Sequence, residues 1–132
     1  MGKTRERWLV DGMDEYLKRL SPHVLFECAW YKDQSALEEA LKKESHCILL
    51  DPQGKMMGSV DFTDWLFSEI EKAGSRLSIA IGGPDGFSES IKQGKSLLSF
   101  SRMTFTHQLT RLVLLEQLFR AFEIRKGSGY HR

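Results

Sequence analysis

The sequence lacks the features that mark a secreted or membrane-embedded protein. No apolar run approaches the roughly 18 residues that cross a bilayer, and the start, from Met1 to Arg7, contains no apolar core of a secretory signal. Glu6 stands where a myristoylation site requires Ser or Thr. We therefore expect a cytoplasmic protein, or a plastid or mitochondrial one if a transit peptide has been removed.

Cysteine is scarce, with 2 cysteines among 132 residues. Cys28 and Cys47 lie in apolar segments with strand character, so we expect both to be reduced, buried and small apolar side chains. His46 is next to Cys47, but neighbouring residues on a strand point to opposite faces and cannot readily share a metal ion. The sequence therefore predicts no metal site.

Neither sign of charge is in large excess, since the net charge is +1. The distribution is uneven, because residues 102–132 contain six Lys or Arg and two acids, a net +4. Residues 21–101 contain eight Lys or Arg and twelve acids, a net −4. A basic C-terminal segment favours contact with a polyanion such as nucleic acid. A solvated helix face followed by a basic tail explains the same charges equally well.

Helical and extended patterns alternate along the chain. Apolar residues at helical spacing predict helices, and short apolar runs bounded by Gly, Pro or Asp predict strands. The expected helices are residues 5–20, 33–44, 59–73, 88–94 and 107–126, and the expected strands are residues 24–30, 46–50, 77–81 and 97–100. This order predicts one α/β domain over residues 1–132, with a mostly parallel sheet and helices on both faces.

Three loops follow expected strands and form the candidate ligand site: residues 51–54, 82–86 and 100–105. Ligands in open α/β sheets bind beyond the carboxyl ends of strands, and glycines let backbone amides approach a ligand closely. The loop 82–86 is neither a Walker A loop nor a dinucleotide fingerprint, so on spacing alone a plain tight turn is the better interpretation. Phe100, Met103 and Phe105 are candidates for an apolar wall around an adenine ring, or for ordinary core.

The last expected helix points to a self-association, and the tail has two open interpretations. The helix 107–126 is apolar on most sides, so it must be covered by more than the sheet, which favours a homodimer packed through it. Its Glu116–Arg120 pair, at i,i+4 spacing, is expected to be structural. The tail 127–132 is either a flexible end or a segment that closes over a nucleotide, with Tyr130 stacking on a base and Arg132 meeting a phosphate.

A combination of segments spread along the chain is distinctive. The specific segments are residues 81–86, 98–108, 111–121 and 129–132, with further similarity at residues 15–20 and 50–56. Together they closely resemble the RlmH family of SPOUT-class methyltransferases. Members of this family methylate N3 of a pseudouridine in large-subunit ribosomal RNA. Between Glu27 and Glu44 the resemblance is weak.

The resemblance implies a fold, a cofactor, partners and a set of site residues. The fold is a trefoil-knotted SPOUT domain, with the knot over about residues 77–132, and the partners are a second copy and ribosomal RNA in the assembled ribosome. S-adenosylmethionine is expected to lie in the knot, with these contacts: Leu50, Gly82, Phe100, Ser101, Arg102, Met103, Thr104 and Phe105. The substrate is expected to meet the tail residues Tyr130, His131 and Arg132.

This sequence departs from the family pattern in three places. A strand expected ahead of Gly2-Lys3 is absent, the segment 31–35 is short, and Thr106 stands where Pro is common. For the reaction itself, N3 of the base must lose a proton before it attacks the methyl group.

His131 is the candidate base, and Arg132 or Arg111 is the candidate cation that stabilises the resulting anion. Two rival functions stay open: a knotted RNA- or ribosome-binding module that has lost catalysis, and a helix-mediated dimer with only a scaffolding role.

Overall fold

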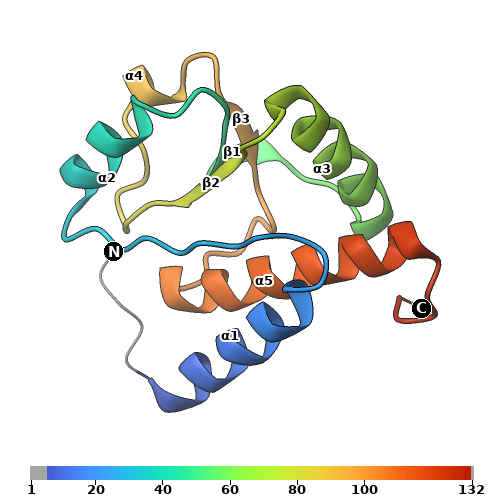
Figure 1. Cartoon of the computed structure of the whole chain (residues 1–132). Coiled ribbons are helices and arrows are strands. Elements are labelled where there is room, and N and C mark those ends of the chain that lie inside the picture. Colours follow the sequence, from blue (N-terminus) through green and yellow to red (C-terminus); the bar gives the residue numbers. More distant parts are fainter. Residues whose placement is uncertain (1–5, 132) are drawn as a thin grey trace.

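A parallel sheet of three strands forms the centre of the computed structural model, which describes residues 6–131 (Figure 1). The strands are β1 (Cys47–Lys55), β2 (Ser78–Ile81) and β3 (Ser96–Leu98), in the order β2-β1-β3. Both neighbours run parallel to β1. Parallel strands require crossover connections, and helices provide them here.

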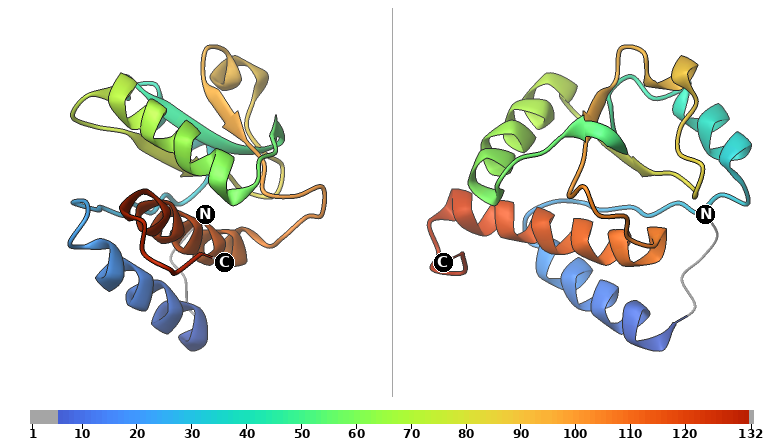
Figure 2. Two further views of the ribbon diagram at one scale, coloured as in Figure 1. Left: turned by 90° about the vertical axis from the view of Figure 1, so that its right-hand side faces the viewer. Right: turned by 180° about the vertical axis from the view of Figure 1, so that it is seen from behind.

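The helices cover both faces of this sheet, as expected for an α/β domain (Figures 1 and 2). They are α1 (Arg7–Leu20), α2 (Gln34–Leu41), α3 (Ser59–Ala73), α4 (Glu89–Lys92) and α5 (His107–Lys126). Figure 2 shows α5 between the sheet and α1, with α1 as an outer layer. The predicted fold class, a parallel α/β sheet with helices on both faces, is confirmed within the described residues.

Side-chain caps explain where α2 and α5 begin. Asp33 was expected to start a helix, and its carboxylate accepts a hydrogen bond from the Ala36 amide at 2.8 Å. Thr106, the residue that replaces the common Pro, caps α5 by accepting from the Leu109 amide at 3.2 Å. Where the family pattern has Pro, which cannot cap a helix with its side chain, this chain therefore has a Thr whose hydroxyl accepts a hydrogen bond from an otherwise unpaired amide of the first turn.

The strand β1 is longer than predicted, because the expected turn at residues 51–54 is a bulge within it. Leu50 and Lys55 both pair with Leu98, so the four residues between them loop out of the ladder. Gly54 lies against the backbone of β3: a Cβ built there would be 2.5 Å from the carbonyl carbon of Leu98. Only glycine permits this approach.

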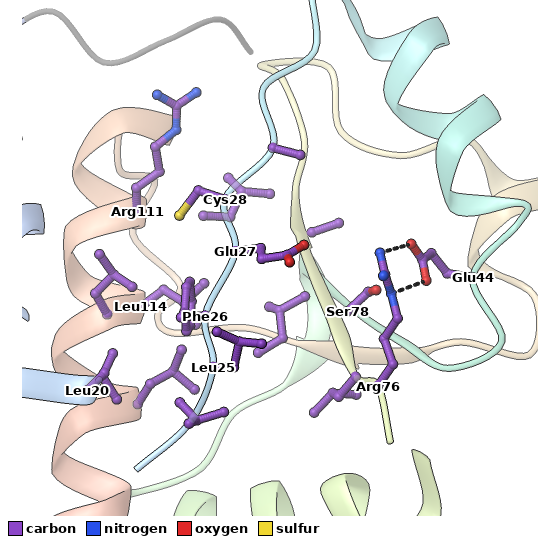
Figure 3. A pocket seen from close by; sticks show the side chains of 18 of the residues that line it. Leu20, Leu25, Phe26, Glu27, Cys28, Glu44, Arg76, Ser78, Arg111 and Leu114 are labelled. Atoms are coloured by element: carbon purple, nitrogen blue, oxygen red, sulfur yellow. Dashed lines mark hydrogen bonds and ion pairs between the residues drawn. The ribbon is translucent and has the colours of Figure 1, made fainter. Parts of the chain in front are cut away.

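The prediction of a strand at residues 24–30 is wrong, since these residues are extended but join no ladder in the described structure. Figure 3 shows the segment passing between α5 and β2. A cavity of about 560 Å³ lies between the segment, β2 and α5, so no strand is adjacent for pairing. Leu25 is 90% exposed, and Cys28, expected to be buried, is exposed as well. Cys47 is buried, and both cysteines are free.

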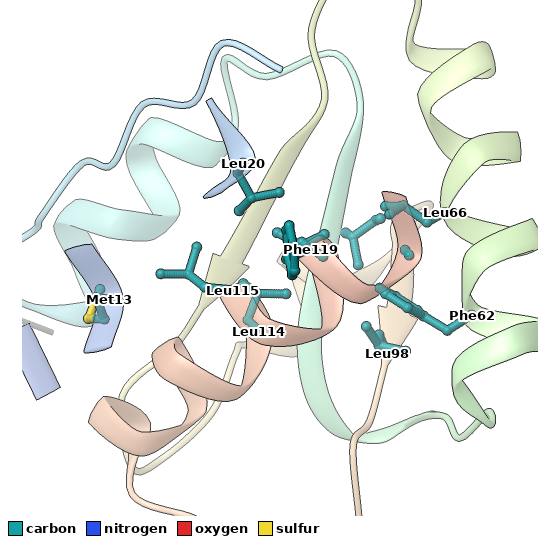
Figure 4. Packing of buried hydrophobic residues seen from close by; sticks show 11 residues of the cluster. Met13, Leu20, Phe62, Leu66, Leu98, Leu114, Leu115 and Phe119 are labelled. Carbon is teal, nitrogen blue, oxygen red and sulfur yellow. The ribbon is translucent and has the colours of Figure 1, made fainter. Parts of the chain in front are cut away.

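Side chains of β1 alternate between two apolar cores, which is why both faces are buried. Ile48 belongs to the larger core, formed with α1, α3 and α5, and Leu49 to the smaller core, formed with α2 and α4. In the larger core Phe119 of α5 meets Leu20 of α1 and Leu66 of α3 (Figure 4). The expected helix 33–44 ends earlier, at Leu41, and anchors the smaller core.

Candidate functional site

The register of the sheet brings the three predicted loops to one edge. Leu50 pairs with Ile81 on one side and with Leu98 on the other, so the last residues of β2 and β3 lie level with the start of the bulge in β1. Gly82 and Ser99 are the first residues after β2 and β3. The loops that the sequence proposed for ligand binding therefore leave neighbouring strands at the same level.

The first loop is fixed by a buried carboxylate. Asp51 is 4% exposed, and its Oδ1 accepts a hydrogen bond from the Gln53 amide at 2.9 Å. Its Oδ2 lies 3.1 Å from Nζ of Lys92, which comes from α4. Hydrogen bonding to Asp51 raises the pKa of Lys92, and burial of the ammonium opposes that rise less strongly. This ion pair fastens the loop 51–54 to the helix that follows the loop 82–86.

The second loop, residues 82–86, begins at a buried glycine. A Cβ at Gly82 would meet the ring of Phe87 at 3.2 Å and Nε2 of Gln34 at 3.3 Å. The amide of Gly83 donates to the side-chain oxygen of Gln34 at 2.7 Å. Sequence reasoning missed Gln34, because the segment that contains it is the part with weak family resemblance and no motif.

The third loop, residues 100–105, is mostly exposed and shaped by serines. Ser99 donates from Oγ to the carbonyl of Ser101 at 3.1 Å, and the Met103 amide donates to Oγ of Ser101 at 2.9 Å. Met103 is 77% exposed and does not form the core that was its alternative interpretation. Arg102 and Thr104 are exposed as well. Their side chains are therefore accessible to a ligand or a partner.

A second cavity, of about 320 Å³, lies beside this loop. Its apolar lining includes Phe100 and Phe105, and its polar lining includes Ser59 and Gln117. The Ser59 hydroxyl donates to Oε1 of Gln117 at 2.9 Å. This volume falls within the usual range of roughly 300–1,000 Å³ for small-molecule sites. Aromatic walls with a few polar groups are typical of small-molecule sites.

The C-terminal tail folds back onto α5. The Tyr130 hydroxyl donates to Oε2 of Glu116 at 2.8 Å, and its ring packs edge-on against Phe119 with centroids 4.9 Å apart. Burial of the ring, followed by the hydrogen bond to Glu116, raises the pKa of Tyr130. Arg120 also binds Glu116, through Nη2 at 2.8 Å, as the predicted i,i+4 pair. The Glu116–Arg120 pair, which we expect from the sequence to be structural, therefore anchors the tail on α5.

His131, the candidate base, lies beside Arg120 rather than beside Arg111. Its Nδ1 is 2.9 Å from Nη1 of Arg120. A guanidinium nitrogen can only donate, so Nδ1 is the acceptor and the proton of the neutral ring is on Nε2. Arg132 lies outside the described residues.

Arg111 occupies a different part of α5. It is 7% exposed, and its guanidinium lies 4.6 Å from the centroid of the Trp30 ring. Burial lowers the pKa of Arg111. Figure 3 shows it above Cys28, on the wall of the larger cavity. Within one protomer the structure does not bring Arg111 and His131 together, since one is near the start of α5 and the other beyond its end.

Comparison with profiles of protein families decides which family this architecture represents. Residues 1–131 match the family described as predicted SPOUT methyltransferase. The chain belongs to the SPOUT methyltransferase family. Since the match extends over nearly the whole chain, the parallel sheet and its three loops are those of a SPOUT methyltransferase, and the resemblance inferred from the sequence is confirmed.

Curated relatives of this SPOUT chain have consistent names. A protein of Protochlamydia amoebophila named ribosomal RNA large subunit methyltransferase H is 48% identical over 132 residues, which cover 100% of this chain and 94% of the relative. Proteins of the same name from Carboxydothermus hydrogenoformans and Prochlorococcus marinus are each 38% identical, with 100% of this chain covered and 96% and 92% of the relatives.

The described residues contain neither a helix suited to crossing a membrane nor a cluster of metal ligands. Among residues 6–131, none of the helices is both long and apolar enough to cross a membrane. The same residues contain no group of three or more His, Cys, Asp or Glu side chains positioned to hold a metal ion.

Proposed function

We propose that this chain methylates N3 of a pseudouridine in large-subunit ribosomal RNA, with S-adenosylmethionine as the methyl donor. The observation that carries the proposal is the 48% identity over the full chain to a methyltransferase named for large-subunit ribosomal RNA. The three loops at the carboxyl edge of the sheet support it, because a ligand of this fold class is expected there.

The proposed cofactor site combines the strand ends with the third loop. Leu50 and Gly82 come from β1 and the start of the second loop, and residues 100–105 form the wall that contains Phe100 and Phe105. When bound, S-adenosylmethionine supplies a methyl group made electrophilic by its sulfonium. The protein's contribution is to hold the accepting nitrogen in line with that methyl group and to exclude water.

The proton of N3 must be removed, and the tail is the proposed place for this step. His131 is the candidate acceptor, and release of Arg120 would free Nδ1 to take the proton. Arg132 and Arg111 are the candidate cations for the anion that remains. Tyr130 is the candidate stacking partner for a base.

The proposed assembly is a homodimer packed through α5. Within each copy, we propose that the chain forms a trefoil knot over about residues 77–132. Leu109 and Val113 of α5 are only partly buried within the protomer, although α1 and α3 both pack against that helix. A second copy would bury this remaining apolar surface. The acceptor is proposed to be the assembled ribosome, because residues 6–131 contain no separate RNA-binding module.

The decisive experiment is methyl transfer from radiolabelled S-adenosylmethionine to purified ribosomes that lack the modification, followed by mass analysis of the nucleosides. We expect label in one N3-methylated pseudouridine of the large subunit. Donor binding without transfer would support the inactive RNA-binding alternative instead. Single-turnover transfer that is unchanged in His131→Ala would remove His131 from the mechanism while leaving the activity in place.

A further inference from the structure

Two side chains of α2 hold both ends of the glycine-rich loop. Gln34 accepts a hydrogen bond from the Gly83 amide at 2.7 Å, and its own amide donates to Oε2 of Glu38 at 3.0 Å. Glu38 then accepts two bonds from Ser88, one from the amide at 3.0 Å and one from Oγ at 2.5 Å. The chain of bonds therefore crosses from α2 to the start and to the end of the loop 82–88.

We infer that Gln34 and Glu38 are positioning residues of the methyl-donor site, which hold the loop 82–88 in its binding conformation before the donor arrives. The inference rests on the proposed function, because it takes this loop, beginning at Gly82, as a contact of S-adenosylmethionine. It assigns the two residues no direct contact with donor or RNA. Their effect on the reaction passes through the backbone of the loop.

Phe87 anchors the end of this loop in the smaller core, but residues 83–86 have little else to fix their shape. Pro84 and Asp85 are exposed. One backbone hydrogen bond, from the Gly86 amide to the Gly83 carbonyl at 3.1 Å, closes the turn that contains them. Gly86 has φ +74°, which glycine adopts without strain but which does not restrict the rest of the loop. A ligand that must order such a loop loses binding free energy in proportion to the conformational entropy removed. A loop that is already ordered avoids this cost, which favours binding.

Glu38 is suited to this role because it is ionised. Burial raises the pKa of its carboxyl, but hydrogen bonds from Gln34 and Ser88 lower it by more, so the net pKa lies below the usual value. An ionised carboxylate only accepts hydrogen bonds, which matches the three donors that face it. An amide at the same position lacks this charge, and it fits the three partners only if it donates to the Ser88 hydroxyl in place of accepting from it.

The apolar side of α2 is independent of these polar groups. Leu37 and Leu41 are buried in the smaller core with Leu49, so α2 keeps its place when Gln34 or Glu38 is changed. Loss of the bonds should therefore loosen the loop without unfolding the protein. This separation lets an effect on positioning be measured apart from an effect on stability.

The test exchanges the two residues. Gln34→Glu places two carboxylates side by side, and Glu38→Ala removes the acceptor that Gln34 and Ser88 share, so each single variant breaks the network. The double variant Gln34→Glu/Glu38→Gln reverses the bond between positions 34 and 38, and the glutamate now accepts from Gly83. Three of the four bonds can form again in the double variant, so rescue is expected.

Calorimetric titration with S-adenosylmethionine and steady-state kinetics on ribosomes provide the readouts. We expect each single variant to weaken donor binding, and raise the donor KM, about tenfold or more, with kcat at saturating donor nearly unchanged. The double variant should recover most of the loss. Glu39→Gln, which removes an exposed carboxylate paired with Lys42 on the outer side of α2, is the matched control and should bind like the original chain.

Each outcome decides between specific failures. If the original chain binds the donor and both single variants bind it equally well, the positioning role is refuted while the proposed function stands. Equal loss in the single and double variants, together with a lower melting temperature, would show a purely structural role and also refute it. If the original chain itself does not bind S-adenosylmethionine, the donor assignment fails, and this inference fails with it.

Discussion

Replacing Tyr130 by Phe removes one hydroxyl from the tail and leaves its aromatic contacts in place. The hydroxyl donates to Glu116 at 2.8 Å, whereas the ring packs on Phe119 and lies 5.0 Å from the guanidinium carbon of Arg120. A hydrogen bond to a charged group contributes about 1.5–3 kcal/mol. Because Tyr130 is only partly buried, we expect the lower end, about 1.5 kcal/mol, for the tail's attachment to α5.

A loss of about 1.4 kcal/mol changes an equilibrium constant tenfold, so the tail should open about ten times more often in Tyr130→Phe. Hydrogen exchange at the amide of Tyr130, which donates to Oγ of Ser128 at 3.3 Å, measures this directly. Exchange should rise about tenfold there and stay the same in the sheet. Tyr31→Phe, a tyrosine packed against the smaller core, is the control.

The same variant connects the tail to activity. If the tail presents His131 to the nucleotide, Tyr130→Phe should reduce kcat/KM for ribosomes and leave the affinity for S-adenosylmethionine unchanged. Unaltered exchange at the tail would show that the Glu116 bond does not hold it, and the reasoning from this contact would then be wrong.

The pH dependence of the tail follows from the raised pKa of Tyr130. The fold favours the protonated phenol, so the stabilisation from this group is fully present below the unfolded pKa of about 10 and is lost as the pH rises from there through the raised pKa of the folded state. Attachment of the tail should therefore be unaffected by this group at neutral pH and weaken only above pH 10. Tyr130→Phe lacks the group and should show no such alkaline loss.

Two further variants test how the loops are held. Gly54→Ala places a Cβ 2.5 Å from the Leu98 carbonyl carbon and should destabilise the protein by about 1–3 kcal/mol or more in chemical unfolding, whereas Gly58→Ala, with no atom within 4 Å, should be tolerated. Equal stability of the two variants would contradict the close approach of β1 and β3. Thr106→Val removes the cap of α5 and should cost about 1 kcal/mol, while Thr106→Ser keeps the hydroxyl and most of the stability.

Local patterns in the sequence predict most of the helices well, because caps and apolar periodicity act within a few residues. Three examples are the cap of α2 at Asp33, the apolar periodicity of α1 that ends at Leu20, and the long helix α5 that begins at His107. Pairing between strands is not local, and the apolar run at residues 24–30 shows the consequence. Its composition fits a strand, but a strand forms only where another backbone is within hydrogen-bonding distance.

The candidate site divides in the same way. The sequence by itself determined the family, the three loops that follow strands and the Glu116–Arg120 pair of α5, because these depend on residue types at fixed spacing. Only the tertiary structure decided that Gln34 and Glu38 reach the loop 82–88, across 49 and 50 positions of the chain. It also placed His131 with Arg120, apart from Arg111. Contacts between distant segments are set by how helices pack on the sheet, which no local pattern records.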